Sequence, residues 1–421
     1  MKSILHKLLR YRLVRNTGWL FSYQISTYIA HLAIIPFLTR VLPVSEYGAV
    51  MAVMAATQLA FTLTDYGFSV SATYEVSLNR DQAVKIQQII ADVHGAKILL
   101  VAGALLALFA LACLPAYRPY PSLFIFAGLT VVAQAYQPVW LFQGLEHMKA
   151  YAFYMVAVRL AFMVSVFVLV RQAGDGVWVL ASLALANGLG MGIGLYTMHS
   201  LGYHPMGMSL HGGLKVLRDT AGYFWGRLAF AAYTSANAIV IGAAGLMQAG
   251  LYTAVEQIYK AGQSVGGPVS QALYPSLANS RDVRVLWKIV PTMTGVMVAG
   301  CGVIAWFAPE VVQLAFGASY ASAVPVLYVF LATVPVSTLG MVLGYPLFAA
   351  LGRPHIANHT LVAAGLVHIT LLGSVWTMGA LSAYNVAFCV LCTESLMLIL
   401  RIILGYITYR RTQLATQSPP P

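Results

Sequence analysis

The sequence predicts an all-α polytopic membrane protein with about twelve transmembrane helices. Of its 421 residues, 60% are hydrophobic and 9% are charged, whereas an ordinary soluble domain is about 25% charged. The mean hydropathy is +0.77, and apolar runs of membrane-spanning length recur along the whole chain. The short alternating segments of a transmembrane β-barrel are absent from the sequence. This composition excludes an ordinary soluble protein.

Twelve apolar segments of about 20–27 residues have the length that a hydrocarbon core of ~30 Å requires. The first follows a basic N-terminus and, at about 25 residues, is too long for the hydrophobic region of a signal peptide. The connections between segments are short, which leaves no room for a soluble second domain. The predicted spans are 17–42, 47–72, 92–115, 121–143, 150–171, 176–199, 221–245, 249–275, 289–309, 322–350, 357–378 and 383–406.

The distribution of Lys and Arg predicts that both termini lie in the cytoplasm. With that orientation, cytoplasmic segments hold 17 of the 24 basic residues, Lys97 among them, and the outer loops hold only Arg40, Arg118 and Arg171. Cytoplasmic loops of membrane proteins carry such an excess of positive charge. The net charge of +12 therefore reflects topology and attraction to anionic membrane lipids, and it requires no nucleic acid.

Two similar halves are expected, 1–205 and 206–421, each forming a six-helix bundle. Residues 16–19 (NTGW) lead into the first span as residues 220–224 (TAGYF) lead into the seventh. The next span in each half opens about 28 residues later with a Tyr-Gly or Gly-Leu-Tyr sequence. Both halves would begin in the cytoplasm, so the repeat would be parallel, about an axis along the membrane normal.

Charged residues inside the predicted spans indicate a binding site, because burying a charge in a bilayer is costly and usually functional. Arg159, Arg227 and Lys260 are predicted to bind an anionic ligand, since these deep cations outnumber Glu256 and Glu394 and guanidinium groups bind phosphate in bidentate fashion. Glu256 and Lys260 are spaced i,i+4, so mutual neutralisation on one helix face is the alternative.

The span that carries Lys260 also contains Gly266, Gly267 and Pro268. Glycine and proline interrupt helices, so this span is not expected to run as an uninterrupted helix, and these three residues are candidate hinge points.

Five residues are candidates for coupling or gating. Each of four has a structural alternative. Asp65 could cap or break the helix beside Gly67, and Glu394 could pair with Arg401. The two histidines could be hydrogen-bonded packing residues. Proton antiport, a sodium gradient and the membrane potential are the three possible driving forces. The candidates are Asp65, Glu256, Glu394, His31 and His368.

No enzyme, cofactor or metal site is predicted. The sequence contains neither a Walker A motif nor HExxH. No outer loop is long enough for the catalytic site of a glycan polymerase or ligase. We therefore expect a transporter.

Four stretches resemble the Wzx-type O-antigen flippases, in the polysaccharide transporter branch of the MOP (MATE-like) superfamily. The similarity covers the first half and continues through the eighth span. The stretches are Pro36–Leu42 (PFLTRVL) followed by Glu46-Tyr47-Gly48; Leu63–Phe68 (LTDYGF) followed by Ser71-Ala72-Thr73; Gln137–Glu146 (QPVWLFQGLE); and Leu251–Lys260 (LYTAVEQIYK) running to Gln271–Pro275 (QALYP).

This resemblance implies two six-helix bundles around a cation-lined cavity in a bacterial inner membrane protein. It implies movement of an undecaprenyl-diphosphate-linked oligosaccharide from the inner to the outer leaflet, with a polysaccharide polymerase and a chain-length regulator as partners. The alternative is a multidrug or small-metabolite exporter of the same superfamily. Such exporters use acidic residues of the N-terminal bundle, where this chain offers only Asp65 at the expected membrane edge and a deep Arg159.

Overall fold

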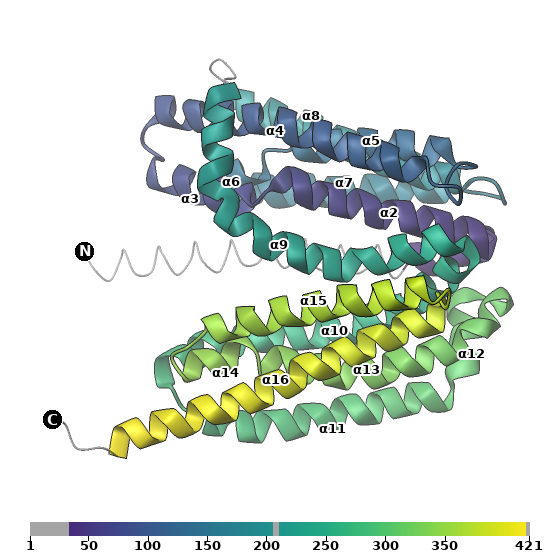
Figure 1. Cartoon of the computed structure of the whole chain (residues 1–421). Helices are drawn as coiled ribbons and strands as arrows, with labels where there is room; N and C mark the ends of the chain where they lie inside the picture. Colours follow the sequence, from purple (N-terminus) through teal and green to yellow (C-terminus); the bar gives the residue numbers. More distant parts are fainter. Residues whose placement is uncertain (1–32, 205–209, 418–421) are drawn as a thin grey trace. The chain divides into compact units, whose positions relative to one another are not determined.

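The computed structural model describes residues 33–204 and 210–417, and every regular element within them is a helix (Figure 1). The chain divides into two compact units, the first ending at Ala231 and the second beginning at Ala232. This boundary lies inside one long helix, α9 (Leu210–Ala244).

The first unit begins, within the described residues, with helical residues 33–41 and continues through seven further helices before α9. Helix α8 packs against α5 and α7, while α2 packs against α4 and α5. The seven helices are α2 (Val44–Asp65), α3 (Phe68–Leu78), α4 (Ala83–Ala112), α5 (Pro121–Ala135), α6 (Val139–Gly144), α7 (Met148–Leu169) and α8 (Gly176–Ser200).

Two predicted spans of this unit are broken helices rather than continuous ones. The span 47–72 is interrupted between α2 and α3, where Tyr66 and Gly67 have φ values of 48° and 98°. These left-handed conformations end an α-helix. The span 121–143 is interrupted between α5 and α6 just before Pro138, which disfavours helical geometry at the preceding residue.

The start of α9 belongs to the first unit because its side chains pack there. Gly213 lies so close to α4 that an added Cβ would stand 2.6 Å from the backbone nitrogen of Ala96. Thr220 shares a 3.1 Å hydrogen bond with Ser71 of α3. The first compact unit therefore ends at Ala231, further along the chain than residue 205, where the first predicted bundle ends.

The second unit continues from α9 through helices that pack mainly on α13 and α16. The predicted span 322–350 is also broken here, at Leu343 and Gly344, between α13 and α14. The elements are α10 (Leu246–Ser280), α11 (Arg284–Trp306), α12 (Ala308–Phe316), the 3-10 helix η1 (Ala318–Ala323), α13 (Val324–Val342), α14 (Tyr345–Ala350), α15 (His355–Thr377) and α16 (Ala383–Gln417).

Helix α10 contradicts the expected interruption, because it runs unbroken through Pro268 and Pro275. Its glycines instead allow a close approach to α13. A Cβ on Gly262 would lie 2.8 Å from a methyl group of Val334, and one on Gly266 would lie 2.7 Å from the methyl group of Thr338. Glycines four residues apart are a recurrent device for close packing of membrane helices.

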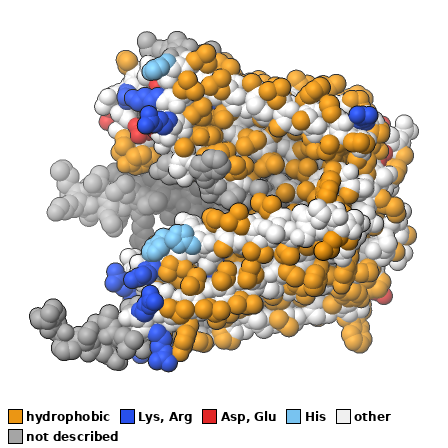
Figure 2. All heavy atoms as spheres, in the orientation of Figure 1, with side chains coloured by type: hydrophobic (Ala, Val, Ile, Leu, Met, Phe, Trp, Pro, Cys, Tyr) orange, Lys and Arg blue, Asp and Glu red, His pale blue; other side chains and the backbone are white. Residues whose placement is uncertain are grey.

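The described residues include nine helical segments that are long and apolar enough to cross a membrane. Large hydrophobic side chains cover the outward faces of both units, as with Phe109 at 70% and Trp306 at 82% exposure. In Figure 2 most of the visible Lys and Arg side chains gather near helix ends instead. Such apolar faces suit a lipid environment, while the orientation of the termini stays a prediction.

Candidate functional site

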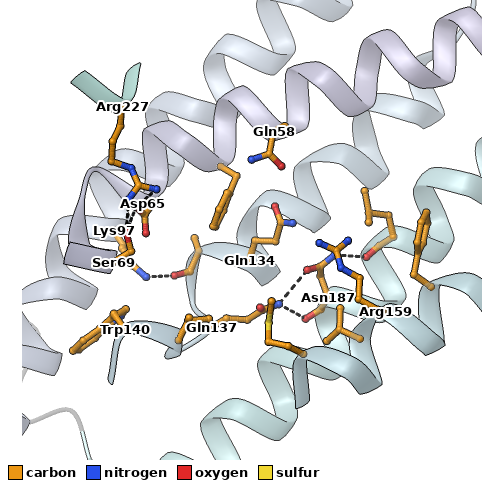
Figure 3. Close-up of a pocket in the computed structure, with 17 residues that line it drawn as sticks. Gln58, Asp65, Ser69, Lys97, Gln134, Gln137, Trp140, Arg159, Asn187 and Arg227 are labelled. Atoms are coloured by element: carbon orange, nitrogen blue, oxygen red, sulfur yellow. Dashed lines mark hydrogen bonds and ion pairs between the residues drawn. The ribbon is translucent and has the colours of Figure 1, made fainter. Parts of the chain in front are cut away.

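The first unit contains a cavity of about 320 Å³ whose walls come from α2 to α9 (Figure 3). Its lining combines charged groups, amides and aromatic rings. The lining side chains are Gln58, Phe61, Asp65, Ser69, Lys97, Gln134, Ala135, Gln137, Val139, Trp140, Met155, Val158, Arg159, Phe162, Leu183, Asn187 and Arg227.

Lys97 occupies one wall of this cavity and is only 3% exposed. Its Nζ donates a hydrogen bond to the backbone carbonyl of Ala135, the last residue of α5. Helix ends leave carbonyl groups without helical partners, so the break before α6 creates the acceptor that Lys97 uses. The grouping of Lys97 with the cytoplasmic basic residues was therefore wrong, because the side chain is buried inside the helix bundle.

Asp65 and Arg227 form an ion pair in the same cavity, with 3.0 Å between Nη2 and Oδ2. Ser69 supports the pair, because its hydroxyl donates to Asp65 at 3.0 Å and accepts a hydrogen bond from Arg227. Asp65 ends α2 beside the break at Gly67, as the helix-break alternative supposes. Its side chain is 11% exposed and lines the cavity, while its position at the membrane edge stays a prediction.

Arg159 projects from α7 into the cavity. Within the described residues its Nε has no hydrogen-bond partner, and it forms no ion pair. Gln134 Oε1 and Trp140 Nε1 are likewise buried without partners. Buried polar groups are nearly always hydrogen-bonded, so these atoms mark a place where a ligand can bind.

The cavity therefore carries three cations, Lys97, Arg159 and Arg227, against one carboxylate, Asp65. In surroundings of low dielectric constant, uncompensated positive charge attracts anions strongly. The arrangement is suited to an anionic ligand that also offers hydrogen bonds.

Lys260 belongs to the second unit, where its Nζ lies 2.8 Å from Oε2 of Glu256 on the same face of α10. The i,i+4 pairing considered as an alternative is thus present. Arg159 and Arg227 share the cavity of the first unit, and the convergence of Lys260 with them stays a prediction.

Glu394 lies on α16 and is 3% exposed. Its Oε1 accepts hydrogen bonds from the hydroxyl groups of Tyr233 at 2.5 Å and Tyr259 at 3.3 Å, while its Oε2 has no partner among the described residues. The proposed pair with Arg401 does not form, because Arg401 donates to Thr360 Oγ1 at 3.1 Å and to the backbone of α13.

His368 is fully buried, and both ring nitrogens are engaged. Nε2 lies 2.8 Å from Asn237 Oδ1, and Nδ1 lies 2.9 Å from Thr393 Oγ1. This geometry matches a hydrogen-bonded packing residue. His31, another coupling candidate, lies outside the described residues.

Sequence reasoning missed Lys97 and Gln134 as cavity residues. Lys97 carried a usable signal, since it lies five residues inside the predicted span 92–115. Gln134 is uncharged, so only the fold reveals that it lines the same cavity as Arg159 and Trp140.

Comparisons with known proteins identify the relatives of this chain. A protein of Escherichia coli (strain K12) that carries the name of an O-antigen transporter is 25% identical over 394 residues, covering 91% of this chain and 94% of that protein. Among solved structures, an inward-facing multidrug resistance MATE family transporter of the MOP superfamily has a TM-score of 0.70 at 13% identity, covering 93% of this chain and 96% of its own.

The lipid II flippase MurJ in an inward closed conformation has a TM-score of 0.63 at 11% identity, covering 91% of this chain and 87% of its own. At such low identity these likenesses concern the fold alone, and they confirm the all-helical class. The chain is a multi-pass bacterial inner membrane protein. The model of the family described as "Polysaccharide biosynthesis protein" matches residues 13–281, more than half of the sequence, and the chain belongs to that family.

Proposed function

We propose that the protein is a flippase that moves an undecaprenyl-diphosphate-linked oligosaccharide from the inner to the outer leaflet by alternating access. The observation that carries the proposal is Arg159, which forms no ion pair with any described residue and lines a cavity with more cations than carboxylates. Membership of the polysaccharide biosynthesis family and the name of the Escherichia coli relative support it.

The diphosphate would bind first at Arg159, since no carboxylate in the described part of the chain pairs with that guanidinium group. Arg227 and Lys260 would exchange Asp65 and Glu256 for phosphate oxygens as the transporter changes state. A ligand shifts a conformational equilibrium only through its different affinities for the two states. Such exchanges would supply the difference in affinity between the two states of a transporter built from predicted bundles 1–205 and 206–421.

Glu394 is the best placed of the coupling candidates. Asp65 and Glu256 each have a cationic partner, and both nitrogens of His368 are engaged. Glu394 alone among the described candidates is a buried carboxyl group with one open oxygen and no ion pair. A proton or a metal cation could bind there during the cycle.

Complementation tests the proposal. A strain that lacks the gene would receive wild-type protein, Arg159→Gln or Arg353→Gln at matched expression, with Arg353 as an exposed control. We expect loss of surface polysaccharide in the deletion strain and with Arg159→Gln, but full restoration with Arg353→Gln. Wild-type polymer in cells carrying Arg159→Gln would contradict the role of Arg159.

The same strains separate the flippase from an exporter. A deletion that alters drug susceptibility and leaves surface glycan intact would favour a multidrug or small-metabolite exporter. The pairing of Asp65 with Arg227 weighs against the exporter, because it leaves this carboxylate less available to a cationic drug.

A polysaccharide polymerase and a chain-length regulator are the proposed partners. Crosslinking in native membranes followed by purification of this chain tests the association. Recovery of neither protein from cells that make surface polysaccharide would argue against a stable complex.

A further inference from the structure

We propose that the cavity of the first unit is a two-part site, in which Arg159 holds a phosphate group and Gln134 with Trp140 holds the sugar ring attached to it. The inference rests on the proposed flippase function and adds a saccharide subsite to it.

Three buried polar atoms of this one cavity have no hydrogen-bond partner among residues 33–204 and 210–417: Gln134 Oε1, Trp140 Nε1 and Arg159 Nε. They come from α5, α6 and α7, so separate parts of the sequence supply them. In Figure 3 Gln134 is drawn between the Asp65–Arg227 pair and Arg159. Because buried groups of this kind normally have partners, their meeting indicates a polar ligand.

The neighbouring amides behave differently and are part of the scaffold. Gln137 Nε2 donates to the backbone oxygen and Oδ1 of Asn187 at 3.1 and 3.2 Å, and Asn187 Nδ2 donates to the Leu183 carbonyl at 2.8 Å. These bonds fix α8 against the break between α5 and α6. The contrast leaves Gln134 as the buried amide available to a ligand, while the other lining amide, Gln58, is exposed.

The chemistry of the open groups identifies a sugar. Trp140 can only donate through its ring nitrogen, whereas the amide of Gln134 both donates and accepts whichever way it is turned. An ionised phosphodiester offers acceptors only, and a lipid tail offers neither. The hydroxyl groups of a saccharide donate and accept, so a sugar satisfies Gln134 and Trp140 while the phosphate satisfies Arg159.

The volume of the cavity and the residues of its walls suit a single sugar ring. Its volume of about 320 Å³ lies at the lower end of small-molecule sites, which span about 300–1,000 Å³. Phe61 and Phe162 add aromatic surface to the lining, against which the apolar face of a sugar ring can pack. The subsite therefore holds the sugar next to the phosphate, and the remaining sugars lie outside it.

Binding of two lipids to the purified full-length protein in nanodiscs tests this assignment. The probes are undecaprenyl diphosphate and the same lipid bearing a single N-acetylglucosamine. The variants are Gln134→Leu and Trp140→Phe, with Arg159→Gln for the phosphate and exposed Gln313→Leu as a control.

Gln134→Leu and Trp140→Phe should weaken binding of the sugar-bearing lipid by about three- to tenfold, the value of one hydrogen bond. Their affinity for the sugar-free lipid should change by less than about twofold, which also shows that the variants are folded. Arg159→Gln should weaken the binding of both lipids by about tenfold or more, since it removes a charged contact. Gln313→Leu should weaken the binding of neither lipid.

Equal effects of Gln134→Leu and Trp140→Phe on the two lipids, or no effect on either, would overturn the sugar subsite while leaving the flippase proposal standing. Failure of the wild-type protein to bind either lipid would overturn the proposed function, and the subsite with it.

Discussion

The ammonium group of Lys97 on α4 donates a hydrogen bond to the main-chain oxygen of Ala135, at the point where α5 ends inside the first unit. The C-terminal end of a helix carries partial negative charge and unpaired carbonyl groups. Lys97 thus supplies both a positive charge and a hydrogen bond where the helix is interrupted, and it couples α4 to the cavity wall.

Replacing this side chain should destabilise the protein. Lys97→Met keeps the apolar stem but leaves the Ala135 carbonyl unsatisfied, at a cost of about 1–3 kcal/mol for a buried acceptor. We expect a lower Tm for Lys97→Met in detergent, whereas Lys288→Met, at an exposed position, should match wild type. Equal melting temperatures for all three proteins would show that Lys97 contributes no net stability.

The fold class was predictable because composition and hydrophobic length depend little on tertiary detail. Arg159 and Arg227 were identifiable because an arginine inside an apolar run is unusual, and both line the cavity. Lys97 was misplaced because the predicted span began at 92, whereas α4 begins at Ala83. Those extra residues move Lys97 from an expected membrane edge into the helix interior.

The breaks and glycines were harder to interpret. Pro138 and Gly67 interrupt helices, yet Pro268 does not, because sequence alone does not show whether neighbouring helices can hold a proline-containing segment straight. Gly266 was a candidate hinge point, but its contact with Thr338 on α13 shows that it permits close packing, as Gly262 does beside Val334. Such distinctions depend on contacts between distant parts of the chain.

The packing of α10 on α13 provides a second prediction. Gly266→Ala should destabilise the second unit, because its new methyl group would stand 2.7 Å from the methyl group of Thr338 and force a shift worth about 1–3 kcal/mol. A Cβ added at Gly300 on α11 would have no neighbouring atom within 4 Å. Gly300→Ala should therefore leave stability unchanged or raise it by up to about 1 kcal/mol through the helix.

Thermal unfolding of the two alanine variants in the same detergent checks this difference. A Gly266→Ala protein as stable as Gly300→Ala would show that α10 and α13 adjust to the extra methyl group without cost.

The Asp65–Arg227 ion pair provides a third prediction. Asp65→Asn leaves Arg227 without its carboxylate, and Arg227→Gln leaves Asp65 without its cation, so each single change should reduce transport. The double variant removes both charges and should be less impaired than the two separate losses combined, by a coupling of about 0.5–3 kcal/mol.

Transport rates of the wild type, the two single variants and the double variant in proteoliposomes give that coupling directly. Strictly additive effects would show that the two residues act independently, in spite of the 3.0 Å between their charged atoms.

The open oxygen of Glu394 leads to the fourth prediction, which concerns the driving force. Glu394→Gln preserves the shape of the side chain and one acceptor oxygen, but the amide cannot gain or lose a proton or bind a cation as a carboxylate does. Tyr233→Phe removes the 2.5 Å hydrogen bond to Oε1 without removing the carboxyl group. Glu310→Gln changes an exposed carboxylate and serves as the control.

Reconstituted protein would be assayed for flipping of lipid-linked oligosaccharide under an imposed pH gradient, a sodium gradient, or neither. If Glu394 binds the coupling ion, Glu394→Gln should reduce the gradient-driven rate to the rate measured without a gradient. Tyr233→Phe should keep part of the response, and Glu310→Gln all of it. The gradient that loses its effect identifies the ion, whereas a full response to both gradients in Glu394→Gln would place coupling elsewhere in the chain.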